Sequence, residues 1–182
     1  MSRAPVPSTL SLAILGLVSI QPRSGYDLRK IFSTTPMGHF STSPGAIYPA
    51  LRRLERNRLV KSRIEKKDTL RPKQIYVLTK KGKKELEQRL SKPVIRDDVI
   101  WRLDELMLRF AFMGHALGQK QSLDFLRELV PHLNEYVRHL KGHLKMNRVH
   151  MTTNGAYAME QGIAKYQATA RWAKRVTKEL QR

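Results

Sequence analysis

The sequence predicts a mainly α-helical protein, with an N-terminal winged helix-turn-helix followed by an all-helical C-terminal dimerisation domain. Three observations predict this fold class. Short helical segments occupy most of residues 8–56, two segments of alternating apolar and polar residues follow, and the pattern from residue 93 onward is helical throughout. Because Ser91-Lys92-Pro93 interrupts the pattern, we expect two domains, residues 1–92 and residues 93–182.

The first two helices are predicted from their capping residues. Ser8 or Thr9 can cap a helix that ends near Ile20, and its apolar residues are numerous enough to predict that most of it is buried. Ser24 and Asp27 have the spacing of a capping box, in which each side chain bonds the backbone of the other. They open a second, shorter helix.

A third helix is predicted after Ser43 at the N-cap and Pro44 at the first helical position. One face of this helix is an apolar stripe made of Ile47, Ala50, Leu51 and Leu54. The opposite face is formed by Gly45, Pro49, Arg52, Arg53 and Arg56. A third short helix with a basic outer face is the arrangement expected of a helix-turn-helix.

A two-stranded wing is predicted from the next two segments, residues 59–65 and residues 73–78, where apolar and polar residues alternate. In the first segment one face is expected to hold Val60, Ser62 and Ile64. Residues 66–72 form the tip between the strands. Thr79 then caps a lysine-rich helix that ends near Leu90.

The C-terminal domain is expected to contain three longer helices. Asp97 or Asp98 opens the first, which is apolar nearly all round and therefore needs cover on more than one side. The second runs from Ser122 to about Met151, with a bend expected at Pro131.

The last helix, residues 154–180, carries a heptad seam, because its apolar and small residues recur in alternating steps of three and four. The seam consists of Ala156, Met159, Ile163, Tyr166, Ala170, Ala173, Thr177 and Leu180. We expect it to hold a homodimer together. The alternative is an intramolecular seam against the apolar stripe between Leu133 and Leu144.

The charge of the chain indicates a polyanionic partner. Thirty-five Lys and Arg against 15 Asp and Glu give a net charge of +20. Most of the excess is N-terminal, with 20 basic and 6 acidic side chains up to residue 92 and 15 and 9 after it. A solvated basic face is the alternative, but such a field costs self-repulsion, so double-stranded DNA is the expected partner.

Composition also excludes several classes of protein. Cysteine is absent, which excludes disulfides, thiolate metal sites and cysteine nucleophiles. Neither a membrane span nor a signal peptide is recognisable, so we expect a cytoplasmic protein. No nucleophile elbow, P-loop, dinucleotide fingerprint or zinc-protease signature occurs, so we expect neither an enzyme nor a cofactor or metal.

Four blocks in the N-terminal half resemble the PadR family of transcriptional regulators. They are Leu15-Gly16-Leu17, Ser24-Gly25-Tyr26-Asp27-Leu28, the run from Ser43 to Glu55, and the run from Ile75 to Gly82. The resemblance covers residues 9–90 firmly, and residues 95–182 more loosely resemble the helical domain of longer members. It implies a dimeric regulator, usually a repressor, with DNA contacts in the third helix and the wing.

Two departures from the family pattern concern the same region. Arg58 stands where the family usually has glycine, so a positive φ there would strain the backbone, although the charge could reach a phosphate. The wing tip, Leu70-Arg71-Pro72-Lys73, is not glycine-rich.

The expected DNA-binding residues fall into three groups. Arginines on the third helix are candidates to contact base edges or phosphates. Residues at the N-terminus of this helix are candidates to bind a phosphate. Tyr48 is a boundary residue that could instead pack against the first helix. Basic residues of the wing are candidates for phosphate or minor-groove contact. The complete set is Ser43, Gly45, Tyr48, Arg52, Arg53, Arg56, Lys61, Arg63, Lys66, Lys67, Arg71 and Lys73.

Two further sets in the C-terminal domain are open to a functional and to a plain interpretation. A pocket for a small-molecule effector is one interpretation of Trp101, Met107, Phe110 and Trp172, and ordinary core is the other. Four histidines fall near one line of a continuous helix, His132, His139, His143 and His150, which suggests either a metal or pH switch or a polar flank. The competing function is a non-specific nucleoid-associated or RNA-binding winged-helix protein, which shares the charge but needs no dimerisation domain.

Overall fold

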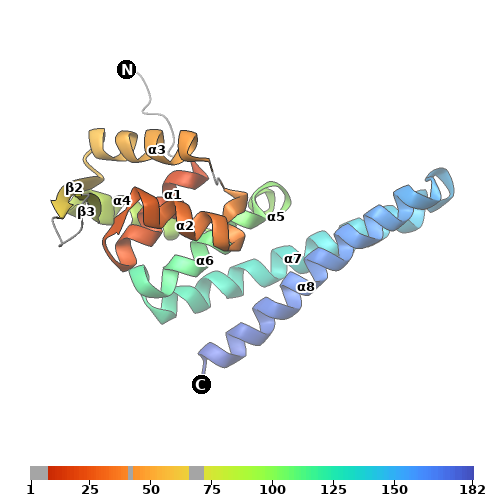
Figure 1. The fold of residues 1–182 in the computed structure, drawn as a ribbon. Helices are drawn as coiled ribbons and strands as arrows, with labels where there is room; N and C mark the ends of the chain where they lie inside the picture. The colour runs from red at the N-terminus through yellow and green to blue at the C-terminus, as the bar shows by residue number, and fades with distance from the viewer. Residues whose placement is uncertain (1–7, 41–42, 66–71) are drawn as a thin grey trace, which may run out of the picture. The chain divides into compact units, whose positions relative to one another are not determined.

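The computed structural model describes residues 8–40, 43–65 and 72–182, apart from the side chain of Pro44. The chain forms two compact units, Met1–Ser91 and Lys92–Arg182, which are described in turn. Figure 1 follows the chain from red at the N-terminus to blue at the C-terminus. In the part that the structure describes, no helix is both long enough and apolar enough to cross a membrane.

Unit 1 contains the four expected helices and the two expected wing strands in the expected order, and local sequence signals set the helix starts. Its elements are α1 (Thr9–Ile20), β1 (Arg23–Ser24), α2 (Gly25–Thr34), η1 (Pro36–His39), α3 (Pro44–Arg56), β2 (Val60–Glu65), β3 (Lys73–Leu78) and α4 (Lys80–Leu90). The expected caps are confirmed. Ser8, Ser43 and Thr79 accept backbone N–H groups of α1, α3 and α4. Ser24 and Asp27 form the complete capping box of α2.

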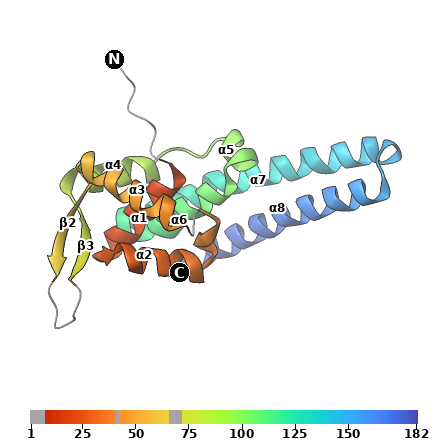
Figure 2. The ribbon, with the colours of Figure 1, turned by 45° about the horizontal axis from the view of Figure 1, so that its top comes forward.

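The sheet of unit 1 has three antiparallel strands in the order β1-β3-β2. The β2–β3 hairpin of the wing, seen in Figure 2, is the expected one, and its register pairs Val60 with Leu78 and Glu65 with Lys73. The third strand, β1, was not expected; it pairs Arg23 with Tyr76. The expected alternation of burial fails at Ile64, which is 70% exposed because the distal part of the hairpin has no core beneath it.

The core of unit 1 lies around α1, which is buried at every position from Leu10 to Val18. Fully buried side chains of the surrounding helices pack in the same core, namely Leu28, Phe32, Ile47, Leu51, Leu86 and Leu90. Helix α4 approaches the chain near β2 at Gly82. A Cβ built at Gly82 would lie 1.9 Å from the carbonyl oxygen of Leu59, so the position accepts no side chain without movement of the backbone.

Unit 2 is all helical, but its first helix is divided. Its elements are α5 (Arg96–Trp101), α6 (Leu103–Leu117), α7 (Gln119–Asn147), η2 (Arg148–His150) and α8 (Thr153–Leu180). The expectation of one helix opened by Asp97 or Asp98 is therefore wrong. Helix α5 begins at Arg96, after an N-cap residue with no side-chain cap, and the chain leaves helical geometry at Arg102, with φ −138° and ψ 29°. Helix α7 continues through both Pro131 and Gly142.

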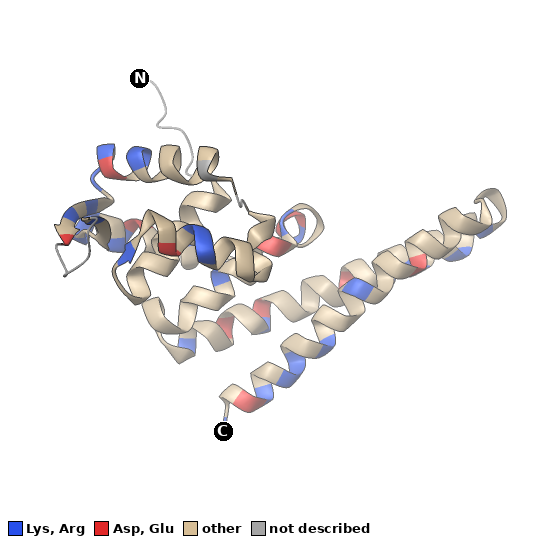
Figure 3. Cartoon of the chain, in the orientation of Figure 1, with Lys and Arg blue, Asp and Glu red and all other residues tan. Residues whose placement is uncertain are grey.

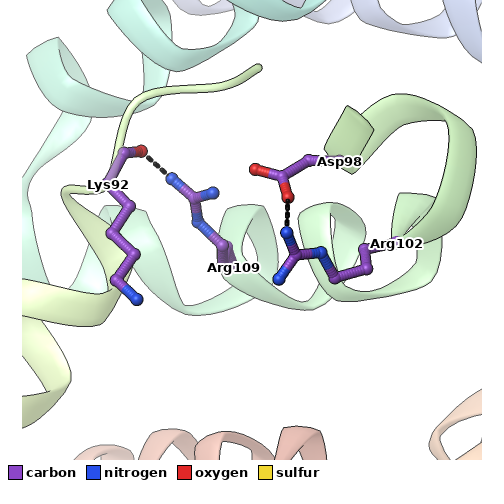
Figure 4. A network of polar contacts seen from close by, with 4 residues as sticks. All are labelled: Lys92, Asp98, Arg102 and Arg109. Atoms are coloured by element: carbon purple, nitrogen blue, oxygen red, sulfur yellow. Dashed lines mark hydrogen bonds and ion pairs between the residues drawn. The ribbon is translucent and has the colours of Figure 1, made fainter. Parts of the chain in front are cut away.

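Side chains of α6 and α7 hold the first residues of unit 2 in place, as Figure 4 shows in part. Arg109 is 4% exposed and donates to the carbonyl oxygen of Lys92. The N–H of Val94 donates to Oε2 of Glu128 at 3.0 Å. Burial lowers the pKa of Arg109, although nearby carboxylates, led by that of Asp98, oppose the shift.

Helix α8 packs along α7 of the same chain, and Figures 1 and 2 both show the two helices side by side. Half of the residues of the heptad seam are buried in the single chain, and the other half are partly exposed. Ala156, Ile163, Ala170 and Ala173 are buried within the single chain, and Tyr166 meets Tyr136 of α7 edge to face at 4.9 Å. The intramolecular alternative therefore describes where these side chains lie.

Candidate nucleic-acid interface

The orientation of α3 follows from its two faces. Ile47, Ala50 and Leu51 are each fully buried, and Leu54 is nearly so. This face fixes the rotation of the helix, and the opposite face is left in solvent, where Arg52, Arg53 and Arg56 are all exposed. Figure 3 shows basic residues on the C-terminal half of α3.

The N-terminal end of α3 presents polar groups. Oγ of Ser43 accepts the N–H of Gly45 at 3.2 Å, and both residues are exposed. Tyr48 is 40% exposed and rests on Gly25, where a Cβ would lie 2.6 Å from Cε1 of the ring. The tyrosine therefore packs against the first residue of α2.

The wing adds exposed cations to the interface. Lys61, Arg63 and Lys73 are exposed on β2 and β3. The remaining three wing candidates, Lys66, Lys67 and Arg71, lie outside the described residues.

Helix α3 and the wing are joined by Glu55, which was not among the expected site residues. Its Oε1 accepts the backbone N–H of Ser62 at 3.1 Å and the hydroxyl of Ser62 at 2.6 Å. Nε2 of Gln74 in turn donates to Oγ of Ser62 at 2.9 Å. On its solvent side Glu55 lines an open groove of about 460 Å³ together with Arg52 and Arg56.

Tyr76 of β3 lies beneath this region and is 5% exposed. Burial raises the pKa of its phenol, and the charge of Glu55 and the neighbouring Tyr48 raise it further, against the effect of Arg52. The phenol therefore stays neutral at physiological pH and adds no negative charge near the arginines.

The turn between α3 and β2 confirms the expected strain at Arg58. Its φ is +58°, in the left-handed region that favours glycine. Two bonds close the end of the helix: the N–H of Leu59 donates to the oxygen of Leu54 at 2.9 Å, and that of Arg58 to the oxygen of Glu55 at 2.9 Å. This is a Schellman motif, whose left-handed residue is usually glycine.

The candidate effector residues of unit 2 are only partly brought together. Phe110 and Trp172 meet edge to face at 5.2 Å, and Met107 is partly exposed. Trp101 is 80% exposed on α5.

The histidine line is divided between two elements. His132, His139 and His143 lie on α7, whereas His150 lies in η2 and so is not on the same continuous helix.

Comparison with known proteins gives one family match. Residues 14–88 match the model of the transcriptional regulator PadR-like family, as the sequence blocks indicated. The negative transcriptional regulator PadR of Bacillus subtilis is 29% identical over 119 residues, which cover 65% of this chain and 64% of that protein. The match thus spans less than two thirds of the relative.

Solved structures of similar proteins include two regulators. Bacillus subtilis PadR in complex with operator DNA has 24% sequence identity and a TM-score of 0.44, covering 95% of this chain and 99% of that one. A PadR-like transcriptional regulator from Bacillus cereus has 27% identity and a TM-score of 0.44, covering 98% of this chain and 99% of that one.

Proposed function

We propose that this chain is a sequence-specific repressor that binds a near-palindromic operator as a homodimer, because residues 14–88 match the model of the transcriptional regulator PadR-like family. The observation that carries the proposal is the arrangement of α3. Its apolar face is fully used by the core, so Arg52, Arg53 and Arg56 are directed to solvent beside a basic wing. Repression is supported by the similarity to a relative named as a negative regulator.

Each part of the interface has a distinct role in this proposal. Arg52 and Arg53 on α3 contact base edges in the major groove, where arginine pairs well with guanine. The start of α3, where Ser43 and Gly45 are exposed, meets a phosphate through the positive end of the helix dipole. Lys61 and Arg63 of the wing hold the neighbouring backbone without reading sequence.

The dimer is proposed to form through unit 2, because one winged helix reaches a single half-site. Four residues of the heptad seam are buried within the single chain, so a partner subunit would meet the partly exposed remainder of α8 and other surfaces of unit 2. Large apolar side chains are exposed in unit 2 and support such a contact; they are Ile95, Trp101, Met146, Val149 and Tyr157.

The test is selection of binding sites from random duplex DNA by the purified full chain, followed by competition with unrelated DNA. A specific regulator should enrich a motif with two related half-sites and prefer it by about 10³-fold or more. Recovery of no motif, with equal affinity for every duplex, would establish the competing non-specific function instead. Sedimentation of the complex would give the number of chains bound to each site.

A further inference from the structure

Glu55 occupies an unusual place for an acidic residue. It is the only acidic residue between Pro44 and Arg56, and it lies between two exposed arginines of the helix proposed to meet DNA. A carboxylate there repels phosphates, so charge alone disfavours it. Its position therefore calls for a role other than contact with DNA.

The hydrogen bonds of Glu55 supply that role. In an antiparallel pair, alternate N–H groups point away from the partner strand. On β2, the edge strand of the sheet, Oε1 of Glu55 accepts the N–H of Ser62. The hydroxyl of Ser62 donates to the same oxygen, so its own oxygen is left to accept from Gln74. A series of hydrogen bonds thus runs from Gln74 on β3 through Ser62 on β2 to Glu55 on α3.

The carboxylate of Glu55 makes this series of hydrogen bonds directional and strong. A carboxylate offers only acceptors, and bonds to an ionised acceptor are shorter and stronger than neutral ones. The 2.6 Å separation between Oγ of Ser62 and Oε1 of Glu55 is of that kind. Because Glu55 accepts a backbone N–H as well as the hydroxyl, it fixes the main chain of β2 and not only a side chain.

We propose that Glu55 is a positioning residue that fixes the wing relative to α3, so that both reach the same duplex together. The inference rests on the proposed DNA-binding function. Loss of the carboxylate frees β2 from α3, and the wing cations then contribute less to binding. The effect of replacing Glu55 with a neutral residue separates two explanations. If only its charge matters, the replacement should tighten DNA binding. If Glu55 positions the wing, the replacement should weaken DNA binding.

The experiment measures the affinity of the full chain for a 30-base-pair duplex of random sequence. Glu55→Ala is compared with Glu87→Ala, a matched control that removes one negative charge from α4, where Glu87 faces Lys83 at 3.8 Å. We expect Glu55→Ala to bind about tenfold more weakly. The slope of log affinity against log salt concentration should also be less steep, by the contribution of about one phosphate contact. Glu87→Ala should bind as tightly as the parent or slightly more tightly.

A double-mutant cycle with the wing separates positioning from general loss of stability. Arg63→Ala should cost about tenfold in the parent and only about twofold in the Glu55→Ala background. Arg53 takes no part in the hydrogen bonds between Glu55, Ser62 and Gln74. The effects of Arg63→Ala and Arg53→Ala should therefore be additive. Hydrogen exchange of the Ser62 amide should accelerate in Glu55→Ala while α1 amides stay protected.

The outcomes distinguish the two proposals. If the parent binds the duplex but Glu55→Ala binds as Glu87→Ala does, or the Arg63 cycle is additive, the positioning role is wrong and the DNA-binding function stands. If the parent binds no duplex, the proposed function fails and the positioning role fails with it. An unchanged Ser62 exchange rate overturns the link between α3 and β2 whatever the affinities show.

Discussion

Replacing Arg58 with glycine is expected to stabilise unit 1 by about 0.5–1 kcal/mol. Arg58 has φ +58° because the Schellman turn requires a left-handed residue there. A residue with a Cβ loses about 1–2 kcal/mol in this conformation, which glycine regains. Glycine also makes the unfolded chain more flexible, at a cost of about 0.4–1 kcal/mol, and the difference between the two effects is the expected gain.

The measurement is native-state hydrogen exchange of the buried amides of α3. Fluorescence is unsuitable, because Trp101 and Trp172 both lie in unit 2. Arg58→Ala is the matched control, since it removes the same charge but keeps the Cβ, and it should give no gain. Arg58→Asn should give part of the gain, because asparagine tolerates this conformation. If Arg58→Gly is no more stable than Arg58→Ala, the left-handed conformation of residue 58 does not destabilise the protein, and the prediction is wrong.

Three further outcomes are expected. Burial opposes ionisation of Asp27, but the hydrogen bonds from Ser24 and the charges of Lys73 and Arg23 together lower its pKa. Its stabilisation is therefore present above the usual value of 3.8 and is lost as the pH falls through the lowered one. Asp27→Asn should therefore cost about 1 kcal/mol in denaturant unfolding at pH 7 and progressively less as the pH falls below 3.8 and through the lowered pKa; a loss that does not change with pH would contradict this. Gly82→Ala should cost about 3 kcal/mol or more, because the new Cβ meets the carbonyl of Leu59, and a melting temperature equal to that of the parent would disprove the close approach. On a selected operator, Arg52→Ala should lose about 1–3 kcal/mol of base preference, whereas Lys61→Ala should weaken every duplex alike; uniform losses for both would mean that α3 does not read sequence.

Sequence reasoning succeeded where the physical cause is local. The capping side chains Ser24 and Thr79 bond backbone groups within three residues, so their spacing is visible in the sequence. Strand β1 was missed because two residues carry no periodicity, and its pairing partner Tyr76 lies about fifty residues further on. The division at Arg102 was missed because the residues on both sides continue the same apolar pattern.

The same limit applies to the site. A heptad period shows that one face of α8 is covered, but it is identical for a partner chain and for α7 of the same chain. The period therefore predicted the buried face at Ile163 and Ala170, and the structure shows α7 covering it. Glu55 was missed because its role depends on Ser62, and which N–H groups of β2 point away from β3 is set by the register of the hairpin.

The edge position of β2 also affects the tendency of the protein to aggregate. An unpaired strand edge is a template for a strand of another molecule, and exposed Ile64 adds an apolar contact to that edge. The charges of Lys61 and Arg63 oppose such pairing between two copies, because like charges would face each other at close range. Neutralising these cations thus removes a barrier to aggregation as well as a contact for phosphate. Wing variants should accordingly be examined for self-association before their affinities are compared.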